Sequence, residues 1–141
     1  MMDINSIFWE RLHGGVTHFP IAFIFGAALF DGFGVFCPSK QREFQTTSYW
    51  LLILGGVGSF AAMLSGLAVS KGDACGRGLL LQHHLFVWPA FALIVGLTSW
   101  RVAAGDNPSR RAFAIYLSIL AITCALVGGA GFSGGELILG H

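Results

Sequence analysis

Four long runs of uncharged residues, separated by short charged segments, constrain this chain more than any other feature. The runs extend from Leu12 to Phe30, from Phe44 to Ser70, from Gly78 to Trp100 and from Ala112 to Gly135. Each approaches or exceeds the roughly 20 apolar residues that a helix needs to cross about 30 Å of hydrocarbon. Charged residues make up only 11% of the chain, far below the share typical of soluble domains. The sequence therefore predicts an integral membrane protein.

The runs predict membrane-spanning helices near 17–36, 48–70, 82–101 and 111–139. Short connections between them favour an all-α, up-and-down four-helix bundle that forms a single domain over residues 1–141. The first run follows acidic residues and Arg11 rather than a basic head, so we expect a retained helix and not a signal peptide. Residues Ile4 to Leu12 have the apolar spacing of a short interfacial helix, with a frayed tail as the alternative.

The distribution of basic residues predicts the orientation of the bundle. Five basic residues fall beside the two connections on one side and three on the other. These are Lys40, Arg42, Arg101, Arg110 and Arg111 on the first side, and Arg11, Lys71 and Arg77 on the second. Because cytoplasmic loops carry an excess of Lys and Arg, we expect the first side to be cytoplasmic and both termini to lie outside.

All five histidines fall at helix ends that this topology brings to the external face. They are His13, His18, His83, His84 and His141. Imidazole is the commonest metal ligand in proteins and a standard axial ligand of haem iron. A histidine at headgroup depth is also a common interfacial residue, and that is the alternative for each one alone. As a set, the histidines predict a ligand cluster.

The positions of the histidines are compatible with haem b. Helices one and three of an up-and-down bundle are diagonal, so we expect His18 to face His83 or His84 across the core. No CxxCH motif is present, so any haem is bound non-covalently. Glycines on helices two and four leave room for a flat ring, although small-xxx-small helix packing is the better explanation for Gly58-Ala62-Gly66 and Gly131-Gly135. The examples are Gly55, Gly58, Ala62 and Gly66 on helix two, and Gly128, Gly131, Gly134 and Gly135 on helix four.

A non-haem metal site is the alternative. Its ligands would be His18, His84 and His141, joined by the carboxylate of Glu136 or Asp73. Nitrogen and oxygen ligands of this kind suit zinc, copper or non-haem iron. Because four places for imidazole exceed the two that one haem needs, His13 and His141 have other possible roles, such as binding propionates, relaying protons or completing this metal site.

Asp31 is a carboxylic acid inside the first predicted helix, 17–36. It lies thirteen residues beyond His18, or about 20 Å along a helix that rises 1.5 Å per residue. A carboxylate at mid-bilayer costs about 2.5–3.5 kcal/mol on insertion scales. We therefore expect Asp31 to have a polar partner or to be neutral, and to serve either proton and quinone handling or the stability of the bundle. Glu136 is a second candidate for such a role.

Two motifs carry a resemblance to a known family. One is His13-Gly-Gly-Val-Thr-His18-Phe-Pro-Ile-Ala, with Asp31 one helix length on, and the other is the ending Gly134-Gly135-Glu-Leu-Ile-Leu-Gly-His141. They resemble a family of predicted bacterial membrane proteins, domain of unknown function 2231, over essentially the whole chain. Some members occur fused to or beside c-type cytochrome modules. The resemblance implies redox work in the bacterial inner membrane.

Together these observations predict a redox subunit without a catalytic domain of its own. We expect it to hold haem b near the periplasmic face and to pass electrons between a membrane donor such as quinol and a c-type cytochrome or larger complex. A subunit of a complex or a homo-oligomer is expected in the lipid bilayer. The alternative is a structural subunit or a metal-binding transporter. The net charge of +1 and the absence of a basic stripe exclude a nucleic-acid partner.

Overall fold

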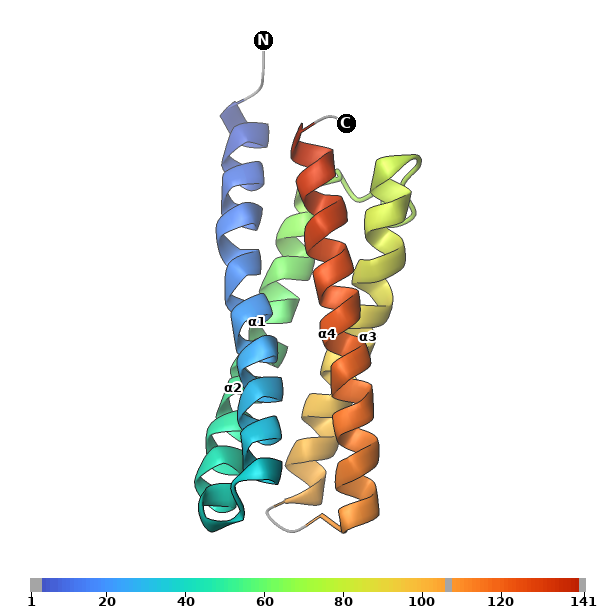
Figure 1. Ribbon diagram of the computed structural model, residues 1–141. Helices are drawn as coiled ribbons and strands as arrows, with labels where there is room; N and C mark the ends of the chain where they lie inside the picture. Colours follow the sequence, from blue (N-terminus) through green and yellow to red (C-terminus); the bar gives the residue numbers. More distant parts are fainter. Residues whose placement is uncertain (1–3, 106–107, 140–141) are drawn as a thin grey trace.

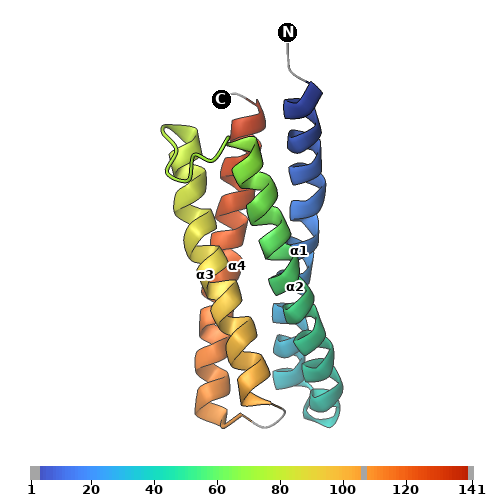
Figure 2. The same cartoon turned by 180° about the vertical axis from the view of Figure 1, so that it is seen from behind.

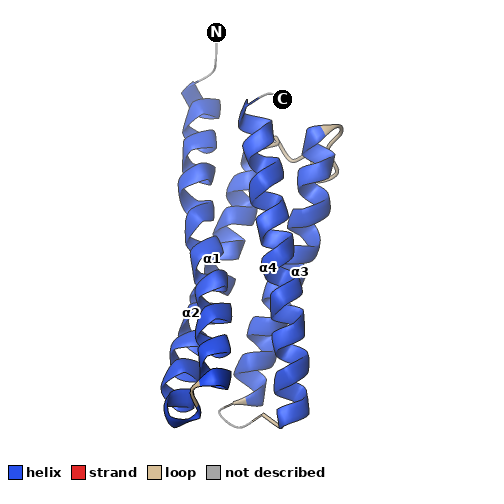
Figure 3. Cartoon of the chain, viewed as in Figure 1, coloured by secondary structure: helices blue, strands red, loops and turns tan. Residues whose placement is uncertain are grey.

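The computed structural model describes residues 4–105 and 108–139, which form long helices and short connections (Figure 1, Figure 3). Within these ranges the long helices are α1 (Ile4–Phe36), α2 (Gln41–Val69), α3 (Leu79–Ala104) and α4 (Arg110–Leu139), and the 3₁₀ turn η1 (Pro38–Lys40) precedes α2. Each long helix is apolar and long enough to cross a membrane. The predicted four-helix membrane bundle is confirmed.

The helices are connected up and down, as expected. Helix α1 packs along α2 and α3 packs along α4, while α2 contacts α3 and α4 contacts α1. Helices α1 and α3 are therefore diagonal. Figures 1 and 2 show that the start of α1, the end of α2, the start of α3 and the end of α4 meet at one end of the bundle. We call it the histidine end, because it carries His13, His18, His83 and His84.

The tightly packed core lies away from the histidine end. The first buried residue of α1 is Pro20, and the first buried residue of α3 is Ala90, each well inside its helix. The buried apolar residues are Ile24, Ala27, Leu52, Ala90, Ile94, Leu97, Phe113, Tyr116, Leu120 and Val127. Toward the histidine end, the buried residues are Ser65 of α2 and Ser133 of α4.

The expected interfacial helix over residues 4–12 is wrong, because α1 runs without a break from Ile4 to Phe36. The glycines at 14 and 15 do not interrupt it. Thr17 Oγ1 donates a hydrogen bond to the Gly14 carbonyl. A backbone surrounded by lipid keeps its helical hydrogen bonds because no water is there to replace them. The first apolar residues extend α1 instead of lying beside it.

Pro20 lies deep inside α1, rather than in the first turn that the predicted helix over 17–36 would give it. Its ring is buried against α2, because a Cβ on Gly58 would lie 3.3 Å from Pro20 Cδ. Helix α2 likewise begins earlier than predicted, since Thr46 and Thr47 donate their hydroxyl protons to carbonyls four residues back. The polar residues before the apolar run thus continue the helix.

Candidate functional site

His13 lies on α1 against α2, and its hydrogen bonds define its tautomer. Ser65 Oγ donates its single proton to the Ala62 carbonyl at 2.9 Å, so it accepts from His13 Nδ1, which lies 2.9 Å away. Nδ1 therefore carries the ring proton and Nε2 keeps a free lone pair. A Cβ on Gly66 would lie 3.0 Å from His13 Cε1, so the absence of a side chain at Gly66 leaves the space that the ring occupies.

His83 lies in the same way on α3 against α4. Its Nδ1 donates to the Ala130 carbonyl at 3.0 Å and lies 3.3 Å from Ser133 Oγ. A carbonyl only accepts, so Nδ1 is again the protonated nitrogen and Nε2 is free. A Cβ on Gly134 would lie 3.2 Å from His83 Cε1. Both imidazoles are thus held by a small-residue contact and an oxygen acceptor on the neighbouring helix.

The two imidazoles come from diagonal helices at the same end of the bundle. Both are half-buried. A metal-bound histidine typically donates its other ring N–H to an oxygen, which fixes the tautomer and the direction of the ring. His13 and His83 both have this arrangement.

His84 and His18 are placed differently. The His84 ring centroid lies 6.1 Å from that of His83, and its buried Nδ1 has no hydrogen-bond partner among the described residues. His18 is exposed, and its Nδ1 donates to the Gly14 carbonyl of its own helix at 2.5 Å. The expectation that His18 faces α3 is wrong. Five residues turn a helix by about 500°, so His18 points about 140° away from His13 and faces outward.

The other predicted ligands do not join a cluster. Glu136 is half-buried near the end of α4, and His141 lies outside the described residues. Asp73 is exposed in the connection between α2 and α3, where it accepts from the backbone N–H groups of Gly76 at 2.8 Å and Cys75 at 3.0 Å. These two bonds hold the pKa of Asp73 below its usual value. Within residues 4–105 and 108–139, no group of three His, Cys, Asp or Glu side chains is placed to hold a metal ion.

Asp31 has the polar partners that its position required. Its side chain is 0% exposed, and Oδ2 accepts from Ser48 Oγ at 2.5 Å and Tyr116 OH at 2.7 Å. Arg101 Nη2 lies 3.7 Å from Oδ1. We call these residues the polar node. It joins every long helix of the bundle: α1, α2, α3 and α4.

Sequence reasoning missed the role of Arg101. The residue was counted among the basic residues flanking a loop, but it is 4% exposed, and its guanidinium lies 5.3 Å from the Tyr116 ring centroid. Without Arg101, the basic residues that predict the orientation number four against three. A signal was present, because Arg101 directly follows the apolar run that ends at Trp100, just as Asp31 directly follows the run that ends at Phe30.

Sequence reasoning also missed Ser65 and Ser133. Both sit in the same local pattern, Ala-x-x-Ser-Gly, at 62–66 and 130–134. The glycines of the predicted small-residue stripes divide into two groups. Those of α2 pack on α1, which confirms the helix-packing interpretation there. The expected packing of Gly131 and Gly135 is wrong, because a Cβ on either would meet no atom within 4 Å.

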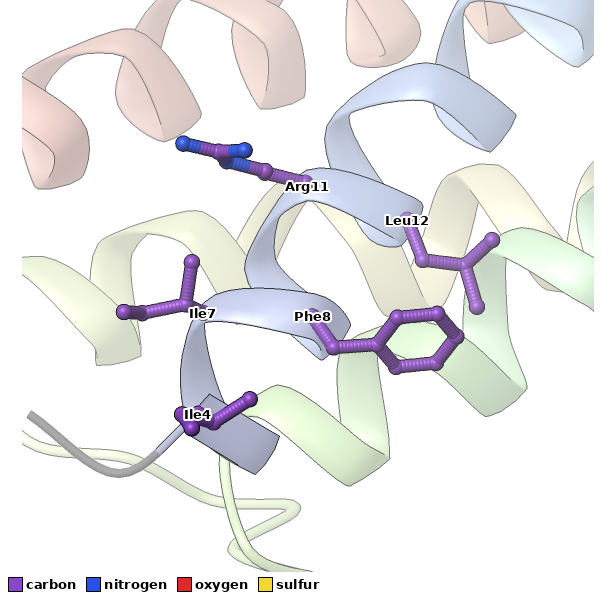
Figure 4. A pocket seen from close by; sticks show the side chains of 5 residues that line it. All are labelled: Ile4, Ile7, Phe8, Arg11 and Leu12. Atoms are coloured by element: carbon purple, nitrogen blue, oxygen red, sulfur yellow. The ribbon is translucent and has the colours of Figure 1, made fainter.

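A separate hollow lies on the surface at the start of α1. It has a volume of about 430 Å³ and is lined by Ile4, Ile7, Phe8, Arg11 and Leu12. Figure 4 shows Phe8 and Leu12 pointing to one side of the helix, and Ile7 and Arg11 to another. A lining of apolar side chains with one arginine suits contact with lipid at the membrane surface, and it lies apart from the imidazoles of the histidine end.

A comparison with protein families supports the membrane fold. The family model described as "Predicted membrane protein (DUF2231)" matches residues 10–141. Comparisons with curated proteins and with solved structures found no match. The family match covers α2, α3, α4 and nearly all of α1, including both imidazoles described above. The chain thus belongs to the family of predicted membrane proteins called domain of unknown function 2231.

Proposed function

We propose that this protein is an electron-transfer subunit of the bacterial inner membrane that binds haem b at its histidine end. One observation carries the proposal: His13 and His83, on diagonal helices, both have Nδ1 bonded to oxygen and Nε2 free. Two neutral imidazoles presenting Nε2 from opposite sides are the donor set of a bis-histidine haem. When bound, the haem iron would accept and release one electron.

The chain's other residues fit this group. On α1 and α4, Cβ atoms on Gly14, Gly131 and Gly135 would meet nothing within 4 Å, which is compatible with room for a ring. The buried Nδ1 of His84 has no partner among the described residues, so a polar group of a ligand, such as a propionate, would satisfy it. Bis-histidine ligation needs two protein ligands, whereas the zinc, copper or non-haem iron alternative needs three or more.

The remaining residues of the site would position the ligands and restrict water. Ser65 and the Ala130 carbonyl hold the two rings in the tautomer that leaves Nε2 available. Apolar helices surround the site and lower its dielectric, which favours a neutral over a charged ligand set. With both termini in the periplasm, the haem would lie near the periplasmic face, within reach of a c-type cytochrome, and quinol in the bilayer would be the electron donor.

The test is a reduced-minus-oxidised visible spectrum of the full chain, expressed with haem available and purified in detergent, with metal analysis of the same sample. We expect a sharp low-spin α-band that His13→Ala and His83→Ala each abolish. The control is His18→Ala, which changes an outward-facing imidazole of the same helix and should retain the band. A colourless protein would overturn the proposal, and bound metal without porphyrin would support the non-haem alternative.

A further inference from the structure

We infer that the chain consists of two repeats of one helical hairpin, and that a single haem would be held between them by one imidazole from each repeat, with one edge of the ring using the open α1–α4 side. The repeats are α1–α2 and α3–α4. Both hairpins start and finish at the histidine end (Figure 1), so the axis runs parallel to the helices, as in other membrane proteins with parallel repeats. The inference rests on the proposed function.

Each of the buried positions of α3 corresponds to a buried position of α1. Adding 70 to positions 20, 24, 27 and 31 of α1 gives positions 90, 94, 97 and 101 of α3, and all eight residues are buried. Ile24 and Ile94 are the same residue type at corresponding positions, and Asp31 corresponds to Arg101. The central ion pair of the polar node therefore joins equivalent positions of the two repeats.

Helices α2 and α4 correspond in the same way. Adding 68 to positions 48, 52, 55, 59 and 65 of α2 gives positions 116, 120, 123, 127 and 133 of α4, and all ten residues are buried. Ser48 thereby corresponds to Tyr116, and both donate to the same oxygen of Asp31. The polar node is made of two equivalent pairs.

The histidine site obeys the same relation. His13 corresponds to His83 by the spacing of 70, and Ser65 corresponds to Ser133 by the spacing of 68. In each repeat, the imidazole on the first helix is within hydrogen-bond distance of the serine on the second helix. A two-fold axis that exchanges the repeats also exchanges the two imidazoles, so a group that both of them ligate lies on the axis. This gives one group per chain, with one ligand from each repeat.

The symmetry is broken beside the two rings. Gly14 corresponds to His84, and Gly131 corresponds to Met63. The flank of α1 that carries Gly26 packs on Leu51 of α2. Gly14 lies on the other flank, which the bundle turns toward α4.

The flank of α4 that bears Gly134 contacts His83 of α3, and Gly131 lies on the flank turned toward α1. Small residues therefore leave the α1–α4 side open at the imidazoles, where a Cβ on Gly14 or Gly131 would meet nothing within 4 Å. The corresponding positions of the α2–α3 side carry the larger residues His84 and Met63, both half-buried. One edge of a ring ligated by both imidazoles would therefore use the open side, and the opposite edge would lie toward His84.

The test fills the open side and leaves every ligand in place. Gly14→Leu and Gly131→Leu are compared with Gly32→Leu, a matched control because Gly32 is also on α1 and a Cβ there also meets nothing within 4 Å. Haem per chain is measured from the pyridine haemochrome and by native mass spectrometry, and size exclusion verifies that each variant is monodisperse. We expect one haem per chain in the wild type, a loss of haem affinity of about tenfold or more in the first two variants, and a change within about twofold in the control.

Two results would overturn the inference while leaving the proposed function intact. They are wild-type haem affinity in a monodisperse Gly14→Leu or Gly131→Leu protein, and two haems per wild-type chain. A wild-type chain that binds no haem would overturn the inference and the proposed function together. If one leucine variant aggregates, the haem affinity of the other variant tests the inference. The two substitutions fill the same space, one from α1 and the other from α4.

Discussion

At His13 and His83, the hydrogen bonds of each ring decide which nitrogen carries the proton. The nearest acceptors differ. His13 Nδ1 has the Ser65 hydroxyl at 2.9 Å, and the ring also bonds the Ala62 carbonyl, whereas His83 Nδ1 has a backbone carbonyl at 3.0 Å and Ser133 at 3.3 Å. A side-chain substitution can remove the nearest acceptor of His13 but not that of His83. The two rings therefore differ in how far they depend on their serines.

This difference makes a prediction for the two serines. Ser65→Ala should lower haem affinity by about 10–100-fold, the usual effect of removing an outer-sphere partner. Ser133→Ala should have a much smaller effect, because the Ala130 carbonyl still holds His83. Haem titration in detergent measures both, with Ser70→Ala as the control, since its hydroxyl bonds only the nearby Leu67 carbonyl. Equal losses in the two variants would contradict the account of the acceptors.

Asp73 yields a prediction about pH. The backbone N–H groups of Gly76 and Cys75 hold its pKa below the usual value, which is about 3.9. Since the folded form has the lower pKa, the stabilisation of the loop is complete above the unfolded pKa and is lost as the pH falls through the folded value. The amide NMR signals of Cys75 and Gly76 should titrate with a midpoint below about 3.9, and Asp73→Asn should abolish this titration. A midpoint at or above the usual value would contradict the loop geometry.

At the scale of the helices, the spans were predictable but their inward faces were not. Hydropathy sums over about 20 residues, so α2, α3 and α4 were found despite errors at their ends. The inward face leaves little trace in the sequence, because lipid accepts the same apolar residues that the core accepts. His13 was thus indistinguishable from His18 in the sequence, although the structure turns one inward and the other outward. Ser65 and Ser133 were missed because no charge marks them.

Close helix contacts make a prediction for Gly56. A Cβ there would lie 2.8 Å from Thr98 Oγ1 and 3.4 Å from its Cβ, and a β-branched side chain has few rotamers with which to avoid it. Gly56→Ala should destabilise the α2–α3 contact by about 1–3 kcal/mol. Thermal unfolding in detergent compares it with Gly32→Ala, where the added methyl meets open space. Equal midpoints for the two variants would show that α2 and α3 are further apart than described.

For the whole molecule, the polar node is the counterpart of the histidine end. It joins the two hairpins where the core is tight, and it contains the buried ion pair of Asp31 and Arg101. Breaking such a pair is costly because one charge remains buried without compensation, whereas replacing both partners by apolar residues is often neutral. The expectation of a polar partner for Asp31 is confirmed. Its proposed part in proton or quinone handling stays a prediction.

A double-mutant cycle tests the structural role of the node. Arg101→Met should destabilise the bundle by about 3–5 kcal/mol, and the pair Asp31→Leu with Arg101→Met should recover most of that loss. Unfolding in detergent, followed by circular dichroism, measures all members of the cycle. A double variant as unstable as the sum of the single variants would show that the two side chains do not act as a pair.

The proposed orientation can be tested with the exposed cysteines. Cys37 and Cys75 are exposed at opposite ends of the bundle. In a background with Cys124→Ala, a membrane-impermeant thiol reagent added to intact spheroplasts should label Cys75 and not Cys37. Labelling of both thiols after lysis serves as the control. The reverse pattern would place the histidine end, and the proposed haem, at the cytoplasmic face.

The hairpin repeat bears on how such a chain reaches the membrane during synthesis. Each hairpin crosses twice and returns to the side on which it began, so α3–α4 inserts in the same direction as α1–α2. Most helix contacts lie within a hairpin, and neighbouring segments pack as soon as both have left the ribosome. Insertion therefore needs no reorientation of a finished half. The polar node is completed only when α3 brings Arg101 and α4 brings Tyr116 to an Asp31 already in the bilayer. Insertion of the second hairpin thereby supplies the buried carboxylate of the first with its cationic partner.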